Sequence, residues 1–151
     1  MIQSNVETFI GCESSFEEAS VVLYGAPFDS TTSFRPGARF GPSAMRHESF
    51  GLETYSPYQD RDLMDIRVFD SGDLELCFGS SEMALSDIEK RAEEILKAEK
   101  IPVLLGGEHL VTLAAVRAVF NKYPDLHIIH FDAHADLRED YLGVQYSHAC
   151  V

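Results

Sequence analysis

The sequence has few cysteines and few basic residues. The first shortage argues against a disulfide-stabilised protein, and the second argues against a nucleic-acid-binding protein. Three cysteines, Cys12, Cys77 and Cys150, occur in 151 residues, odd in number and far apart. This pattern indicates reduced thiols rather than a disulfide framework and predicts a cytoplasmic protein. Lysine and arginine total 12 against 25 aspartates and glutamates, a net charge of −13. Such a charge repels phosphate backbones, so no nucleic-acid partner is expected, whereas it favours cationic ligands.

Signals for export, membrane insertion and nucleotide binding are also missing. The first twenty residues carry four glutamates, no basic start and no long apolar run. They predict neither a signal peptide nor a membrane span, and no membrane partner is expected. The loop 25–41 is rich in Ser, Thr, Gly and Pro, but it lacks the Gly-Lys-[Ser/Thr] ending of a P-loop. A length of 151 residues allows one domain with a core, and 45% hydrophobic residues argue against a disordered chain.

Strand and helix signals alternate along the chain. Short apolar runs predict strands, and apolar positions at helical spacing predict helices that cover a sheet. This order favours a three-layer α/β/α fold with a mainly parallel sheet. The expected elements are strands at 21–24, 67–70, 101–105 and 126–131, a short helix after Gly41-Pro42, and helices at 81–100 and 110–122.

Three residues with metal-binding side chains, Asp132, His134 and Asp136, alternate directly after the apolar run 126–131. A chain that is still extended as it leaves a strand rises ~3.3 Å per residue and sends alternate side chains to one side. The three groups would then share one side at intervals of ~6.6 Å. Such spacing can straddle the two ions, ~3.5–4 Å apart, of a binuclear hydrolytic site. For the triplet alone, a solvated acidic loop is the alternative.

A second motif, Gly106-Gly107-Glu108-His109, follows the apolar run 101–105 and precedes the helical stretch 110–122. In a strand-helix-strand unit the strands run parallel, and ligands bind outside their carboxyl ends. His109 and the 132–136 triplet are therefore expected at one sheet edge. The glycines allow a tight turn, and the helix start favours a neutral imidazole, the form that binds metal. Beside the triplet, a metal ligand is favoured over a histidine that only caps the helix.

Four segments in chain order resemble the ureohydrolases, the family of arginase, agmatinase and their relatives. Two of them are the motifs just described, which resemble the family's Gly-Gly-[Asp/Glu]-His and Asp-Ala-His-x-Asp signatures. Upstream, Gly25–Asp29 resembles the loop after the family's first strand, and Pro36–Arg46 resembles its P-G-x-R-x-G-P-x-x-[IM]-R segment. The resemblance implies an arginase-like three-layer fold and metal-dependent hydrolysis of a guanidinium group.

Carried over residue by residue, the resemblance implies a site for two Mn²⁺ ions. His109, Asp132 and Asp136 match three ligands of the first ion, while His134, with Asp132 as a bridge, matches part of the second. A ligand set of carboxylates and imidazoles without a thiolate also suits Mn²⁺ better than Fe²⁺ or Zn²⁺. His148 matches a histidine that shuttles protons, and it is the catalytic residue expected here. The family commonly forms trimers and hexamers, so a homo-oligomer is expected.

The family is about twice as long as this chain. Its remaining metal ligands lie in a later Ser-x-Asp-x-Asp-x-x-Asp-Pro segment, and a downstream glutamate pairs with the guanidinium group. Neither feature occurs in residues 1–151. The resemblance therefore implies that 1–151 is the N-terminal half of a single arginase-like α/β domain, incomplete at its C-terminal side. This half alone is expected to be inactive.

Within the family, the residues after the last motif favour agmatine as the small cationic guanidino substrate. The chain continues from Asp136 as Leu-Arg-Glu-Asp-Tyr, similar to agmatinases, and lacks the short Asn/Thr-rich stretch of arginases. The expected reaction converts agmatine and water to putrescine and urea. An arginase or guanidinobutyrase activity is one alternative, and a non-catalytic metal-binding half-domain is another.

The other histidines are interpreted separately. His127 and His130 lie inside the predicted strand 126–131 and are expected to pack or to support the ligands rather than to bind metal. His47 follows the start of a short helix and is expected at the surface. Cys150 lies near His148, but residues two apart rarely face each other as a nucleophile pair. That pair is not expected.

Overall fold

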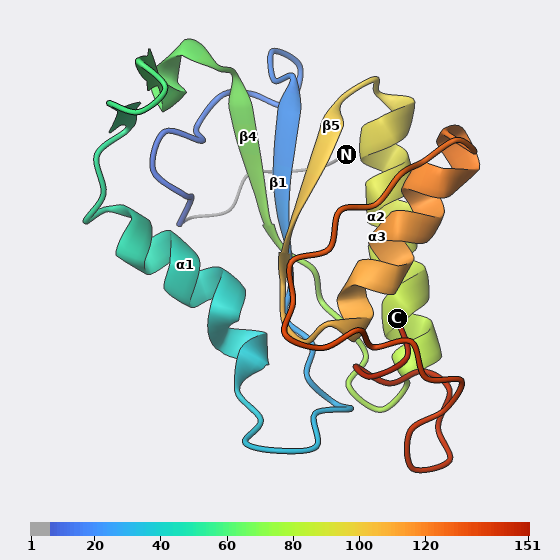
Figure 1. Cartoon of the computed structure of the whole chain (residues 1–151). Coiled ribbons are helices and arrows are strands. Elements are labelled where there is room, and N and C mark those ends of the chain that lie inside the picture. The colour runs from blue at the N-terminus through green and yellow to red at the C-terminus, as the bar shows by residue number, and fades with distance from the viewer. Residues whose placement is uncertain (1–6) are drawn as a thin grey trace.

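The computed structural model describes residues 7–151 and centres on a parallel sheet of three strands. The strands lie in the order β4 (Val68–Asp73), β1 (Val21–Ala26) and β5 (Ile101–Gly106). Val21 pairs with both Val68 and Ile101, so the strands start level and end at one edge. The loops that follow them gather at that edge with the C-terminal segment (Figure 1).

Helices cover both faces of this sheet. Helix α1 (Gly41–Ser49) lies on one side, and α2 (Ser81–Lys97) and α3 (Leu110–Lys122) lie together on the other (Figure 1). The expected three-layer α/β arrangement with a parallel sheet is therefore confirmed. In residues 7–151, no helix has the length and apolar character that a membrane crossing requires. Smaller elements are the 3-10 helices η1 (Ala38–Phe40) and η2 (Leu63–Asp65) and the antiparallel pair β2 (Tyr55–Ser56) and β3 (Arg61–Asp62).

The main core lies between the sheet and the helix pair α2 and α3. Alternate residues of β1, Val22 and Tyr24, are fully buried there with Ile88 and Ile95 of α2. Full burial of one such aliphatic side chain contributes roughly 1.5–3 kcal/mol. Ser80 caps α2, because its side chain accepts a hydrogen bond from the backbone N–H of Met83. The helical spacing read from the sequence thus identified the buried face of α2.

The predicted strand 126–131 is wrong. The structure has no strand at these positions, and Ile129 and Phe131 are 83% and 95% exposed. A strand forms only when a neighbour accepts and donates its backbone hydrogen bonds, and no strand in residues 7–151 pairs with this segment. The segment instead runs as an extended connection from α3 to the C-terminal loops. The predicted strand at 67–70 is present but continues to Asp73.

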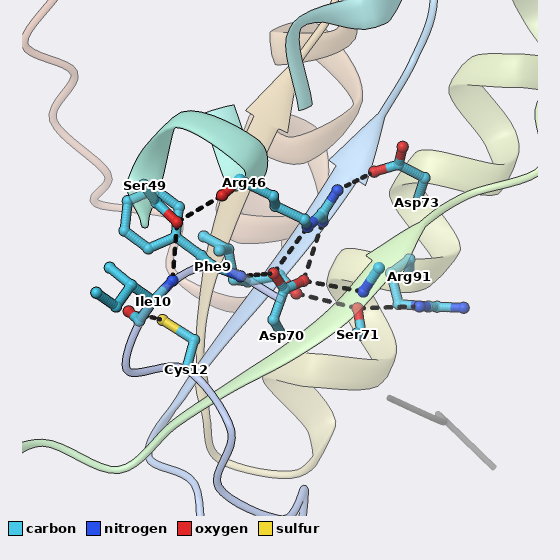
Figure 2. Close-up of polar contacts among 11 residues, drawn as sticks. Phe9, Ile10, Cys12, Arg46, Ser49, Asp70, Ser71, Asp73 and Arg91 are labelled. Carbon is cyan, nitrogen blue, oxygen red and sulfur yellow. Dashed lines mark hydrogen bonds and ion pairs between the residues drawn. The ribbon is translucent and has the colours of Figure 1, made fainter. Parts of the chain in front are cut away.

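The opposite face of the sheet holds a buried ionic network around Arg46 of α1 (Figure 2). The Arg46 side chain is 1% exposed, and its Nε and Nη2 donate to Asp70 at 2.7 and 2.9 Å. Its Nη1 donates to Asp73 at 2.5 Å. Asp70 also accepts the backbone N–H groups of Phe9 and Gly72. The network thus joins α1, β4 and the N-terminal segment, and every donor that Arg46 uses meets a carboxylate.

Cys12 lies close to this network and is expected to resist alkylation in the folded protein. The residue is buried, and burial, with the nearby charges of Asp70 and Glu13, raises the pKa of its thiol to about 11. The reactive thiolate is therefore scarce at pH 8. Iodoacetamide labelling followed by peptide mass spectrometry should modify Cys12 only after unfolding in guanidinium chloride. Rapid stoichiometric labelling of Cys12 in the native protein would contradict this result.

Candidate metal centre

The Gly106–His109 motif joins the end of β5 to the loop after β1. The backbone N–H groups of Gly107 and Glu108 donate to the carbonyls of Ala26 and Phe28 at 2.9 and 2.8 Å. A Cβ atom at Gly107 would overlap the Phe28 backbone, so this close approach requires glycine. The turn delivers His109 to the N-cap position of α3, where the sequence predicts it.

Asp136 lies 27 residues after His109 in the sequence, and the two side chains are in contact. Asp136 Oδ2 lies 2.6 Å from His109 Nδ1, and both side chains are mostly buried. The backbone of Asp136 has a φ of 50°, a left-handed conformation that aspartate tolerates better than most residues. An ionised carboxylate can only accept a hydrogen bond, so Nδ1 of His109 donates to it. Nδ1 of His109 and the carboxylate of Asp136 are both atoms that could bind a metal ion.

Asp132 forms the second part of the cluster. One of its oxygens lies 3.5 Å from His130 Nε2, and the other accepts the backbone N–H of His134 at 2.9 Å. That N–H, together with the nearby imidazoles of His109 and His130, holds the pKa of Asp132 below its ordinary value. Asp132 is therefore ionised at neutral pH, the form that binds a cation. His134 Nδ1 lies 3.5 Å from Asp132, but its side chain is 80% exposed.

Among the described residues, the donor atoms of His109, His130 and Asp132 lie within 4.8 Å of one another. Two ligands that bind one ion at about 2.1 Å can be at most about 4.2 Å apart, so small side-chain rotations would close this set. Imidazole and carboxylate donors without a thiolate fit a divalent first-row metal. His130 is the residue that sequence interpretation assigned to packing or support, yet its ring stacks on His109 at 5.0 Å between centroids.

A cavity of about 350 Å³ opens beside the cluster. His109 and His130 form its polar side, while side chains of α3 and of the 128–137 segment form the rest. The cavity therefore places a mainly apolar surface directly against the candidate ligands. Its apolar lining includes Leu113, Val116, Ile128, Ile129 and Leu137.

His148, in the C-terminal segment, contacts the loop that follows β1 and does not belong to the cluster itself. Its Nδ1 is 2.8 Å from the carbonyl of Thr31, and its backbone N–H donates to the Thr31 hydroxyl at 3.0 Å. Thr31 in turn contacts Glu108, the neighbour of His109. The hydrogen bond of the Cys150 thiol goes to the carbonyl of Val144, with Sγ 4.0 Å from that oxygen. Sequence reasoning proposed His148 as a catalytic residue, but it gave no role to Glu108, which it named only as part of the motif, or to Thr31.

The remainder of the loop after β1 is fixed by a buried carboxylate. Asp29 accepts the backbone N–H groups of Gly37 and Arg39 at 2.7 and 3.2 Å, and it pairs with the Arg39 guanidinium. The Arg39 hydrogen bond lowers the pKa of Asp29, so the anchor is ionised at neutral pH. His47 and His127 are far less constrained. His47 is exposed, as expected, and His127 is exposed rather than packed in a strand.

Comparisons with known proteins match the part of the chain that contains the candidate metal centre. A model described as "Arginase family" matches residues 19–151. Agmatinase from Bacillus subtilis (strain 168) is 52% identical over 143 residues, which are 95% of this chain and 49% of that protein. The crystal structure of agmatine ureohydrolase from Thermoplasma volcanium superposes with a TM-score of 0.89 at 34% identity, covering 97% of this chain and 48% of that one. The structure of proclavaminate amidinohydrolase from Streptomyces clavuligerus superposes with a TM-score of 0.87 at 33% identity. The match covers 97% of this chain and 50% of that one.

The chain spans about half the length of the curated relatives it matches. Within that half, the matched residues 19–151 include the Gly106–His109 motif and the 132–136 motif. They also include the two upstream segments, 25–29 and 36–46. Fold, motif order and sequence identity agree over nearly all of the chain. The chain therefore belongs to the arginase family.

Proposed function

We propose that this chain provides one half of a binuclear Mn²⁺ centre that hydrolyses agmatine to putrescine and urea. Two observations support this most directly: Asp136 contacts His109, and the donor atoms of Asp132 and His130 lie within 4.8 Å of one another and of His109. The chain is also 52% identical to agmatinases. In this proposal His109, Asp132 and Asp136 hold the first ion, and His134 and Asp132 contribute to the second. Bound divalent ions lower the pKa of water and so supply a nucleophile near neutral pH.

His148 is proposed to move the proton that the reaction must transfer. Its Nδ1 faces the Thr31 carbonyl, which can only accept a hydrogen bond, so Nδ1 carries the ring proton in the neutral form. The lone pair then lies on Nε2, whose polar neighbour is the Ser33 hydroxyl at 3.4 Å. In the proposed step Nε2 accepts a proton from the attacking water and passes it to the leaving amine nitrogen. The carbon–nitrogen bond breaks as urea forms.

The substrate proposal predicts faster urea release from agmatine than from arginine. Residues 137–141, which follow the last ligand, read Leu-Arg-Glu-Asp-Tyr and offer no Asn/Thr-rich stretch to bind an α-amino acid. The chain's net charge of −13 also favours a dicationic substrate at long range. A urea assay on the protein in its full encoded length should give a kcat/KM at least ~10²-fold higher for agmatine, about 2.7 kcal/mol of discrimination.

The same assay with 4-guanidinobutyrate separates the other substrate class. That compound keeps the guanidinium group but replaces the distal amine with a carboxylate. A preference for arginine or 4-guanidinobutyrate would overturn the substrate proposal while leaving the hydrolytic chemistry intact. Absence of urea with all three compounds, in protein loaded with Mn²⁺, would overturn the activity itself.

A further inference from the structure

A buried carboxylate organises the loop that holds His148. Glu108 is 7% exposed, although carboxylates are rarely buried without partners. Its oxygens accept the Thr31 hydroxyl at 2.5 Å, the Thr32 hydroxyl at 2.8 Å and the Thr31 backbone N–H at 3.2 Å. Three donors from two consecutive residues therefore converge on one side chain. Hydrogen bonds of this kind to a carboxylate are stronger than neutral ones, so they fix the loop firmly.

Thr31 passes this constraint on to His148 through two further contacts. Its hydroxyl oxygen accepts the His148 backbone N–H at 3.0 Å, and its carbonyl accepts Nδ1–H at 2.8 Å. Because the hydroxyl proton is used on Glu108, the hydroxyl oxygen can only accept from His148. Both the position of the His148 backbone and the tautomer of its ring thus depend on where Glu108 holds Thr31.

We propose that Glu108 and Thr31 are positioning residues that aim Nε2 of His148 at the reacting nitrogen. This inference rests on the proposed function, because it requires His148 to transfer a proton. Glu108 follows directly after Gly107, whose backbone is joined to the loop after β1. The same turn that delivers His109 to the metal centre therefore also sets the direction of the proton-transfer group. The two parts of the site share one rigid support.

The decisive experiment is a double-mutant cycle between Thr31 and His148 in the Mn²⁺-loaded protein of full encoded length. Thr31→Val keeps the shape of the side chain and removes the hydroxyl. It should lower kcat for agmatine about tenfold, part of the ~10²-fold or more expected for loss of acid-base catalysis in His148→Ala, with KM changed less than about twofold. In the His148→Ala background, Thr31→Val should have no further effect on kcat. Thr31→Ser should restore most of the lost rate.

Controls separate positioning from general damage. Thr54→Val makes the same change outside the site and should leave kcat unaltered. Glu108→Gln removes the charge that orders Thr31 and should match Thr31→Val, with bound Mn²⁺ measured because His109 is adjacent. The imidazole nitrogen resonances of His148 give a readout that does not depend on activity. They should show the Nδ1–H tautomer in the parent protein and a mixture of tautomers in Thr31→Val.

The outcomes distinguish this inference from the proposed function. Additive losses in the Thr31 and His148 variants would overturn the positioning role, because Thr31 would then act independently of His148. The same conclusion would follow from an unchanged kcat in Thr31→Val. An unchanged kcat in His148→Ala would instead overturn the proton-transfer role on which the inference rests.

Discussion

Replacing Asp132 with alanine is expected to remove most of the bound Mn²⁺ and to abolish urea release. Asp132 lies between the imidazoles of His130 and His134, each 3.5 Å from one of its oxygens, and the backbone N–H of His134 favours its ionised form. In the proposed centre Asp132 would help to hold both ions, so its loss should weaken the binding of both. Because the metal contributes several kcal/mol to catalysis, kcat/KM should fall by on the order of 10³-fold or more.

Elemental analysis of dialysed protein tests this prediction directly. Asp125→Ala provides the matched control, since it removes an exposed carboxylate from the same connecting segment but outside the candidate ligands. The control should keep the parent metal content and rate. If Asp132→Ala bound as much Mn²⁺ as the parent protein, the proposed centre would be in the wrong place. A thermal melt with and without EDTA would show that the variant remains folded.

Replacing Arg46 with methionine is expected to lower the free energy of unfolding more than any other substitution proposed for this chain. The change keeps much of the buried side-chain volume but leaves Asp70, which is fully buried, and the partly buried Asp73 without their cation. Removing one partner of a buried ion pair typically costs about 3–5 kcal/mol, because an uncompensated charge remains in the interior. That loss is a large part of the total stability of an average domain. Reversible guanidinium chloride unfolding, followed by circular dichroism, measures it.

Arg61→Met is the control variant for this unfolding measurement. Arg61→Met makes the same chemical change on the exposed strand β3 and should alter the free energy of unfolding by no more than about 0.5 kcal/mol. Asp70→Asn in the Arg46→Met background should recover part of the loss, because it removes the unpaired charge. Equal midpoints for Arg46→Met and the parent protein would show that the network contributes no net stability.

Local patterns in the sequence predict the features that depend on neighbouring residues alone. The helical spacing of Ile88 and Ile95 identifies α2 and its buried face, and the residues at its two ends have the charges that a helix dipole favours. The turn before α3 and the position of His109 at its start also follow from local signals, because glycines mark close backbone approach. The contact between His109 and Asp136 was predicted from two parallel strands, but in the structure only His109 follows a strand, and Asp136 lies in the irregular segment after α3.

Features that depend on distant partners were not predictable in this way. The run 126–131 has strong β propensity, but propensity becomes a strand only beside another strand. The role of Arg46 was missed because an arginine in a short helix is usually exposed, and nothing local indicates the two aspartates that surround it. The structural role of Glu108 was missed for a similar reason, since its partners lie 76 and 77 residues away.

The central place of β1 in the sheet has a consequence for how the protein is made. β1 is synthesised first, yet one neighbour begins at Val68 and the other at Ile101. Roughly 80 residues separate β1 from its later partner, which a ribosome adds in about 4–16 s at 5–20 residues per second. Throughout that interval Val22 and Tyr24 belong to a nascent segment whose final neighbours are not yet complete. We therefore expect the yield of folded protein to depend on translation speed and on chaperones that bind apolar nascent segments.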